Sequence, residues 1–283
     1  MLKIYFGVPR FVRNIPVTLL AAAGLSLSLA GMIGCGAGNP FPVGSYERGQ
    51  HFVEKENYVE AVAALESFVR HNPTDSLAAE AQFLKAMTTM KMDEFPLAAV
   101  EFQILRKDYP TSNRVEEANF REGIAYFRQV GRIERDISGA LGARRHFQDF
   151  LVKYPQSSFR PEAEGFLLDI SDLVVLKRLR QCKVFRQLRR FGAIELTMDL
   201  VLTQEPGSRL IDRVLFERAK VAGKLEDAET QVTMYRRLVQ EYPDSPLAEK
   251  ARSELEGISI PDPQVESESG PSAKPDPAPE SDQ

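Results

Sequence analysis

Apolar residues recur along the middle of the chain at spacings of four and three, the period of one face of an α-helix. The same order of residues returns in successive segments: a small residue, then a large apolar one, then another. The clearest examples are Ala61, Leu65 and Phe68; Ala98, Phe102 and Leu105; and Ala143, Phe147 and Phe150. This spacing predicts amphipathic helices whose aromatic residues belong to a packed core rather than to a ligand-binding box.

Short proline-containing segments separate the predicted helices. Proline cannot continue a helix, and it moves the residue before it out of helical geometry. A Ser two residues later can cap the next helix by accepting a backbone N–H; at Ser245-Pro246, the capping Ser precedes a Pro at the first helical position. The five segments are Asn72-Pro73-Thr74-Asp75, Tyr109-Pro110-Thr111-Ser112, Tyr154-Pro155-Gln156-Ser157, Glu205-Pro206-Gly207-Ser208 and Tyr242-Pro243-Asp244-Ser245.

The spacing of these segments identifies the repeat. Their prolines lie 37, 45, 51 and 37 residues apart, and the tetratricopeptide repeat, a helix–turn–helix unit, has a base period of about 34 residues. That repeat requires a small residue where its two helices cross, followed by Ala and a large apolar residue on the second helix. The crossing positions hold Gly49, Ala86, Gly123, Cys182 and Ala219. The fourth unit is degenerate, and in the fifth Gln231 stands where Ala is expected.

We therefore expect an all-α fold, a tetratricopeptide-repeat solenoid of about five helical hairpins over residues 45–257, with disordered termini. An extra stretch around Arg132–Gly139 predicts a longer loop inside the third hairpin. Residues 258–283 are rich in Pro and Ser and carry six acids against one Lys. Such a composition is typical of a disordered acidic tail.

The 51-residue interval allows one long helix from about Pro161 to about Arg189. No acid lies between Asp172 and Glu195. The basic residues of this region are Lys177, Arg178, Arg180, Lys183, Arg186, Arg189 and Arg190. They are explained equally well as a solvated basic face or as a contact for an acidic partner or anionic head groups.

The first 34 residues have the plan of an export signal. Residues 1–14 carry three basic side chains and no acid, and residues 15–33 form an apolar run. The run ends at Met32-Ile33-Gly34-Cys35, which resembles the lipobox of bacterial lipoproteins. The resemblance implies a signal peptide over 1–34, a diacylglycerol on Cys35 and a lipidated tether over 35–44. The alternative is an uncleaved anchor, since 19 residues are just enough to span a bilayer.

Composition narrows the function classes. The net charge of −4 argues against nucleic-acid binding. Three scattered His and two Cys do not suggest a zinc site, and we expect no metal and no cofactor. Cys182 is expected to be a small core residue. No phosphate-binding loop or nucleophile motif is present, so we expect a binding protein rather than an enzyme.

A lipobox followed by about five tetratricopeptide units resembles the outer-membrane assembly lipoprotein family called BamD or ComL. The residues that carry the resemblance are Tyr46-x-x-Gly49, Tyr58-x-x-Ala61 through Pro73, Ala78-x-x-x-Gln82, Phe147-Gln148-Asp149-Phe150 and Tyr154-Pro155-x-Ser157. Two departures from the family pattern lie in the second half. In that family the long helix typically carries a Glu and ends in a Phe-Tyr pair, whereas here this region reads Lys183-Val184-Phe185-Arg186. The second departure is Glu205, which replaces the expected Tyr before Pro206.

The resemblance implies a lipid-anchored scaffold at the periplasmic face of the outer membrane; Gly36, where Asp would signal inner-membrane retention, implies the same membrane. Residues 45–125 would receive unfolded outer-membrane barrel proteins, and residues 160–255 would bind the central barrel-assembly protein. We hypothesise that Arg178, Arg180, Lys183 and Arg186 help to hold that partner. The alternative is a repeat lipoprotein that serves cell-wall division, pilus or secretion machinery.

Overall fold

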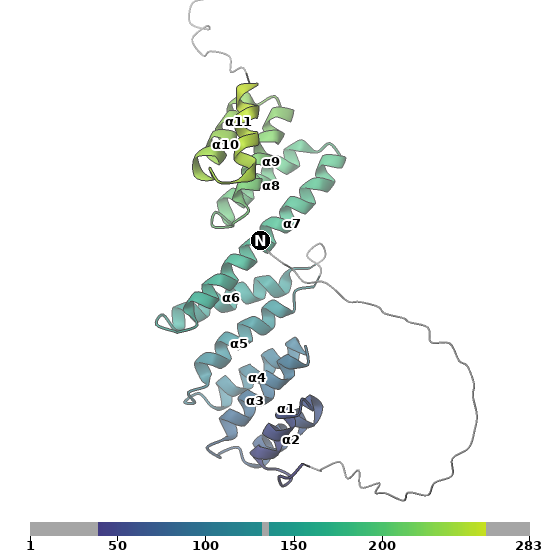
Figure 1. The fold of residues 1–283 in the computed structure, drawn as a ribbon, viewed down its shortest axis with the longest axis vertical. Helices are drawn as coiled ribbons and strands as arrows, with labels where there is room; N and C mark the ends of the chain where they lie inside the picture. The colour runs from purple at the N-terminus through teal and green to yellow at the C-terminus, as the bar shows by residue number, and fades with distance from the viewer. Residues whose placement is uncertain (1–38, 132–135, 259–283) are drawn as a thin grey trace, which may run out of the picture. The chain divides into compact units, whose positions relative to one another are not determined.

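A computed structural model describes residues 39–131 and 136–258 (Figure 1). These residues form eleven α-helices and no strand, which confirms the all-α prediction. The helices are α1 (Tyr46–Glu54), α2 (Tyr58–His71), α3 (Ala78–Lys91), α4 (Phe95–Asp108), α5 (Val115–Arg128), α6 (Ser138–Lys153), α7 (Arg160–Gln187), α8 (Phe191–Gln204), α9 (Ile211–Lys224), α10 (Ala228–Glu241) and α11 (Pro246–Glu256). Successive pairs make five hairpins, and α11 packs on the fifth.

Several sequence predictions lie outside the described residues. These are the signal peptide, the lipid site at Cys35, the tail from residue 259 onward, and residues 132–135 of the expected loop. Within the described ranges, no helix combines the length and the apolar character that a membrane crossing requires.

The turns between hairpins use the predicted hydroxyl groups in two ways. Ser245 is the N-cap of α11, and its side chain accepts the backbone N–H of Leu247, with Pro246 at the first helical position. At Ser112, Ser157 and Ser208 the hydroxyl also accepts the N–H two residues on. There, however, the helix begins three residues after the Ser. These three side chains therefore stabilise the turn that leads into the helix rather than capping the helix itself.

The small residues predicted at helix crossings are required by the packing. A Cβ atom added to Gly49 would lie 2.5 Å from Cδ2 of Leu65, and one added to Gly123 would lie 2.7 Å from Cε1 of Phe147. In the fifth hairpin, the packing also accounts for Gln231, which stands where Ala is expected. Gly223 on α9 faces the Gln231 side chain, whose Nε2 would lie 2.7 Å from an added Cβ. The larger Gln is accommodated because α9 has a glycine opposite it.

The predicted core residues are buried, and the core is divided into clusters that follow one another along the chain. The long helix predicted from the 51-residue interval is α7, with 28 residues. Its first half contributes Ala163 and Ile170 to one cluster, and its second half contributes Val175 and Cys182 to the next. α7 therefore joins the packing of the third hairpin to that of the last two.

Cys182 is a core residue, as predicted. Its side chain is 2% exposed and packs with Ile194 and Met198 of α8. Burial raises the pKa of its thiol to about 11. Because the thiolate is the nucleophilic form, the raised pKa and the burial both disfavour reaction of this thiol near neutral pH.

Candidate functional site

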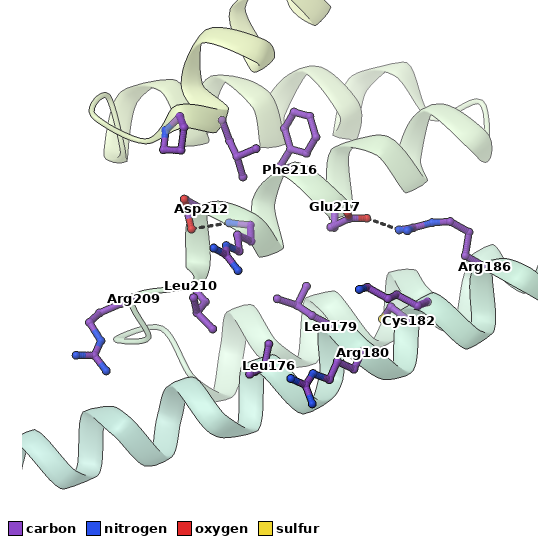
Figure 2. Close-up of a pocket in the computed structure, with 14 residues that line it drawn as sticks. Leu176, Leu179, Arg180, Cys182, Arg186, Arg209, Leu210, Asp212, Phe216 and Glu217 are labelled. Atoms are coloured by element: carbon purple, nitrogen blue, oxygen red, sulfur yellow. Dashed lines mark hydrogen bonds and ion pairs between the residues drawn. The ribbon is translucent and has the colours of Figure 1, made fainter. Parts of the chain in front are cut away.

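The second half of α7, α9 with the two residues before it, and the start of α11 enclose a groove of about 700 Å³ (Figure 2). We call it the α7–α9 groove. Its floor and walls include six apolar side chains, and five cationic and two acidic side chains stand among them. The apolar residues are Leu176, Leu179, Leu210, Phe216, Pro246 and Leu247. The charged residues are Arg180, Lys183, Arg186, Arg209, Arg213, Asp212 and Glu217.

Three of the four basic residues predicted to contact a partner line this groove: Arg180, Lys183 and Arg186. They lie three residues apart on α7, so one helix face presents all of them. Arg178 does not line the groove; its guanidinium donates a long hydrogen bond of 3.5 Å to Gln181. The structure therefore separates Arg178 from the other three predicted residues.

Two of the groove's cations are held by carboxylates. Arg186 forms an ion pair with Glu217 of α9, which links the two walls (Figure 2). Arg209 donates to Asp169 and Asp172 of α7, both at 2.6 Å, and these hydrogen bonds raise its pKa. Lys183 and Arg213 are exposed. In the described part of the chain neither has an ion-pair partner, so their charge is available to a ligand.

Sequence reasoning missed the wall that α9 contributes. Arg209 comes from the turn before α9, and Arg213 and Phe216 come from the first half of that helix, a region that shows no unusual charge by itself. They enter the site because the second half of α7 packs against α8 and α9. An available signal was the spacing of Arg213 and Phe216, three residues apart, which places them on one face of α9.

Glu205, one of the departures from the family pattern, does not line the groove and has a structural role. Its carboxylate accepts two hydrogen bonds from Arg144 of α6, at 2.7 and 3.0 Å, and a third from Ser171 of α7 at 2.8 Å. The Glu205 side chain is only 8% exposed. This bidentate pair joins the loop after α8 to α6, across the long helix.

The turns are also tied to the preceding helices by carboxylates. The hydroxyls of Ser157, Ser208 and Ser245 donate to carboxylates of α5, α7 and α9 at 2.6 to 2.7 Å. The acceptors are Glu116, Asp172 and Asp212. Because Asp212 and Asp172 are engaged in this way, they fix the turns that flank the α7–α9 groove.

The first half of the described chain has smaller recesses. One, of about 290 Å³, lies beside α1 and α2 and is lined by Val43, Arg48, Phe52 and Glu60, among others. Another, of about 510 Å³, is lined by Gln103, Ile104, Arg106, Lys107 and Lys153. In residues 39–131 and 136–258, no three His, Cys, Asp or Glu side chains are grouped so that they could hold a metal ion.

Comparisons with known proteins identify the family. The family model YfiO, described as outer membrane lipoprotein, matches residues 42–204, and a tetratricopeptide-repeat model matches residues 213–245. No curated protein matches the chain. Matching solved structures include a thermophilic tetratricopeptide-repeat protein of Thermus thermophilus, which is 16% identical with a TM-score of 0.31; the match covers 75% of this chain and 95% of that one.

A second matching structure is a tetratricopeptide repeat protein from Parabacteroides merdae, 14% identical with a TM-score of 0.32; the match covers 74% of this chain and 70% of that one. The repeat model and the five hairpins confirm the predicted repeat fold. Because the outer membrane lipoprotein model covers more than half of the chain, the protein belongs to the YfiO family and is a BamD-type tetratricopeptide-repeat lipoprotein.

Proposed function

We propose that this protein is a lipid-anchored scaffold of the machinery that assembles outer-membrane β-barrels. Its α7–α9 groove binds the central barrel-assembly protein, and its first hairpins receive unfolded barrel proteins. The observation that carries the proposal is a groove with exposed cations around an apolar floor, in a chain of the outer membrane lipoprotein family. The protein acts by binding and catalyses no reaction.

The groove's chemistry defines the partner surface that it suits. Lys183 and Arg213 attract carboxylates during encounter, and the effect weakens as salt screens them. The apolar floor around Leu179 and Phe216 suits one or two aliphatic or aromatic side chains, which supply most of the binding free energy. The expected ligand is therefore an acidic segment with apolar anchors, presented by a folded periplasmic domain.

The lipid on Cys35 determines where the scaffold acts. With several acyl chains on Cys35, the protein is held stably on the periplasmic face of the outer membrane, since each buried methylene contributes about 0.8 kcal/mol. A protein held there meets both the assembly protein and its clients close to the site of insertion. Replacing Cys35 by Ser should release the protein from outer-membrane fractions without unfolding it.

The test is copurification of the barrel-assembly protein after crosslinking in the native membrane. We expect Lys183→Glu with Arg213→Glu to reduce recovery of that partner at least about tenfold, because two exposed attractions become repulsions. Arg178→Glu is the control for the single variant Lys183→Glu: it reverses one basic charge on the same helix but outside the groove.

Two outcomes would argue against the proposal. Unchanged recovery with the groove variant would remove the groove from the contact. Recovery of division, pilus or secretion proteins in place of the barrel-assembly protein would favour the alternative function, a scaffold of one of those machineries.

A further inference from the structure

The folded chain neutralises the α7–α9 groove only in part. Glu217 offsets Arg186, and Asp169 and Asp172 offset Arg209. The exposed side chains of Lys183 and Arg213 stand on opposite walls, one on α7 and one on α9. A ligand with two carboxylates and a small apolar group could pair with Lys183 and Arg213 and also contact the apolar floor.

The chain itself contains a segment of that chemistry. Residues 259–283 carry six acids and a single Lys. The part nearest to α11 also has two aliphatic residues, Ile260 and Val265, close to the acids Asp262, Glu266 and Glu268. No other stretch of this length combines as many acids with so few cations. Its charge complements that of the groove.

The segment also starts close to the groove. α11 lines the groove with Pro246 and Leu247, and Ile258, just beyond its end, packs on the same core cluster as Leu179 and Phe216. An 11-residue helix is about 16 Å long. From Ile258, the eight residues to Glu266 can span at most about 26 Å. The carboxylates can therefore return along α11 to the groove.

We propose that residues 259–283 bind the α7–α9 groove of the same chain. Glu266 and Glu268 lie beside Lys183 and Arg213, and Ile260 and Val265 contact the apolar floor. A ligand tethered this closely acts at an effective concentration in the millimolar range, so weak, exposed ion pairs are sufficient. The bound segment competes with any acidic partner for the groove. The inference does not depend on which partner that is.

A zero-length carbodiimide crosslinker tests the contact, because it joins a Lys amine only to a carboxylate that touches it. The purified full chain is treated at low salt, digested and analysed by mass spectrometry. We expect an amide between Lys183 and Glu266 or Glu268, and we expect its yield to fall at least about fivefold in about 0.5 M salt, where exposed charges are screened. An equal mixture of ¹⁵N-labelled and unlabelled protein separates crosslinks within a chain from those between copies.

Two variants control the experiment. Lys183→Arg keeps the charge but has no amine, so it should lose the crosslink. Glu266→Gln with Glu268→Gln keeps the length of the segment and should lose it too. A labelled acidic peptide of residues 259–283 should bind this second variant at least about threefold more tightly than the parent, because the tethered competitor is weakened.

Three results would overturn the proposal. Crosslinks from the segment to Lys107 or Lys153 in place of Lys183 would place it elsewhere. Mixed labelled–unlabelled pairs in about half of the crosslinks, the share expected from random pairing between copies, would make the occupant a second molecule. Peptide affinity unaffected by the Gln substitutions would show that the segment leaves the groove open. Each of these can occur whether or not the barrel-assembly protein is the partner.

Discussion

Replacing Glu205 should destabilise the fold even when the replacement restores the family's own residue. Glu205→Tyr recreates the Tyr-Pro pair found at three of the other turns, and Glu205→Gln changes only the charge. Both leave Arg144 without its carboxylate. Both also weaken or remove the hydrogen bond from Ser171.

The size of the effect follows from burial. Removing one partner of a fully buried ion pair costs about 3–5 kcal/mol. The Glu205 side chain is 8% exposed and that of Arg144 is 23% exposed, so water can partly solvate the orphaned guanidinium. We therefore expect a loss of about 2–3 kcal/mol for either single variant of Glu205.

The assay is urea unfolding followed by circular dichroism, arranged as a double-mutant cycle with Arg144→Met. The double variant Arg144→Met with Glu205→Gln should lose about 1–2 kcal/mol less than the sum of the two single losses. Arg160→Met is the control, because its partner Glu164 is half exposed and such a pair contributes about 0–1 kcal/mol. Single variants within about 0.5 kcal/mol of the parent, or losses that simply add, would show that the pair between Arg144 and Glu205 does not stabilise the fold.

Two further predictions concern the helix crossings and the buried thiol. Gly49→Ala should cost about 1–3 kcal/mol, because its Cβ would overlap Leu65, whereas Gly165→Ala, with open space around the added atom, should gain about 0.5–1 kcal/mol in thermal unfolding; the opposite order would contradict the close crossing. The Cys182 thiol should resist a disulfide reagent at about pH 8 until the protein unfolds. Because burial raises the pKa of Cys182 from 9.0 to about 11, the unfolded thiol ionises first. Relative to Cys182→Ala, stability should therefore be constant below pH 9 and fall as pH rises from 9.0 to about 11; parallel pH profiles would contradict this.

The repeat fold could be predicted because its determinants are local. Each repeat unit contains its own signals: a small residue such as Gly49 on the first helix, apolar residues on the second helix, and a proline at the turn. The apolar spacing predicts each helix, and the proline marks where it ends. The length of α7 could be predicted for the same reason, since it followed from one irregular interval between turns. Its bounds, Arg160–Gln187, are close to those expected.

The groove could be predicted only in part. The basic face of α7 was visible in the sequence, but its division into groove residues and Arg178 depends on where α9 packs. Pairs such as Arg144 with Glu205 join residues 61 positions apart. Periodicity carries no information on contacts of that kind. In the sequence, Glu205 is only a departure from a pattern. In the structure, its carboxylate is largely buried and forms an ion pair with Arg144.

Contact between the α7–α9 groove and the barrel-assembly protein, as we propose it, can be tested in living cells. The most direct measurement places a photo-crosslinking amino acid at Arg213, on the exposed wall of the groove, and irradiates cells that carry the full-length protein. We expect an adduct with a large outer-membrane barrel protein that has periplasmic domains, and no such adduct from the same probe at Arg178. Adducts only with division, pilus or secretion proteins, or the same barrel-protein adduct from Arg178 but not from Arg213, would contradict the proposed contact.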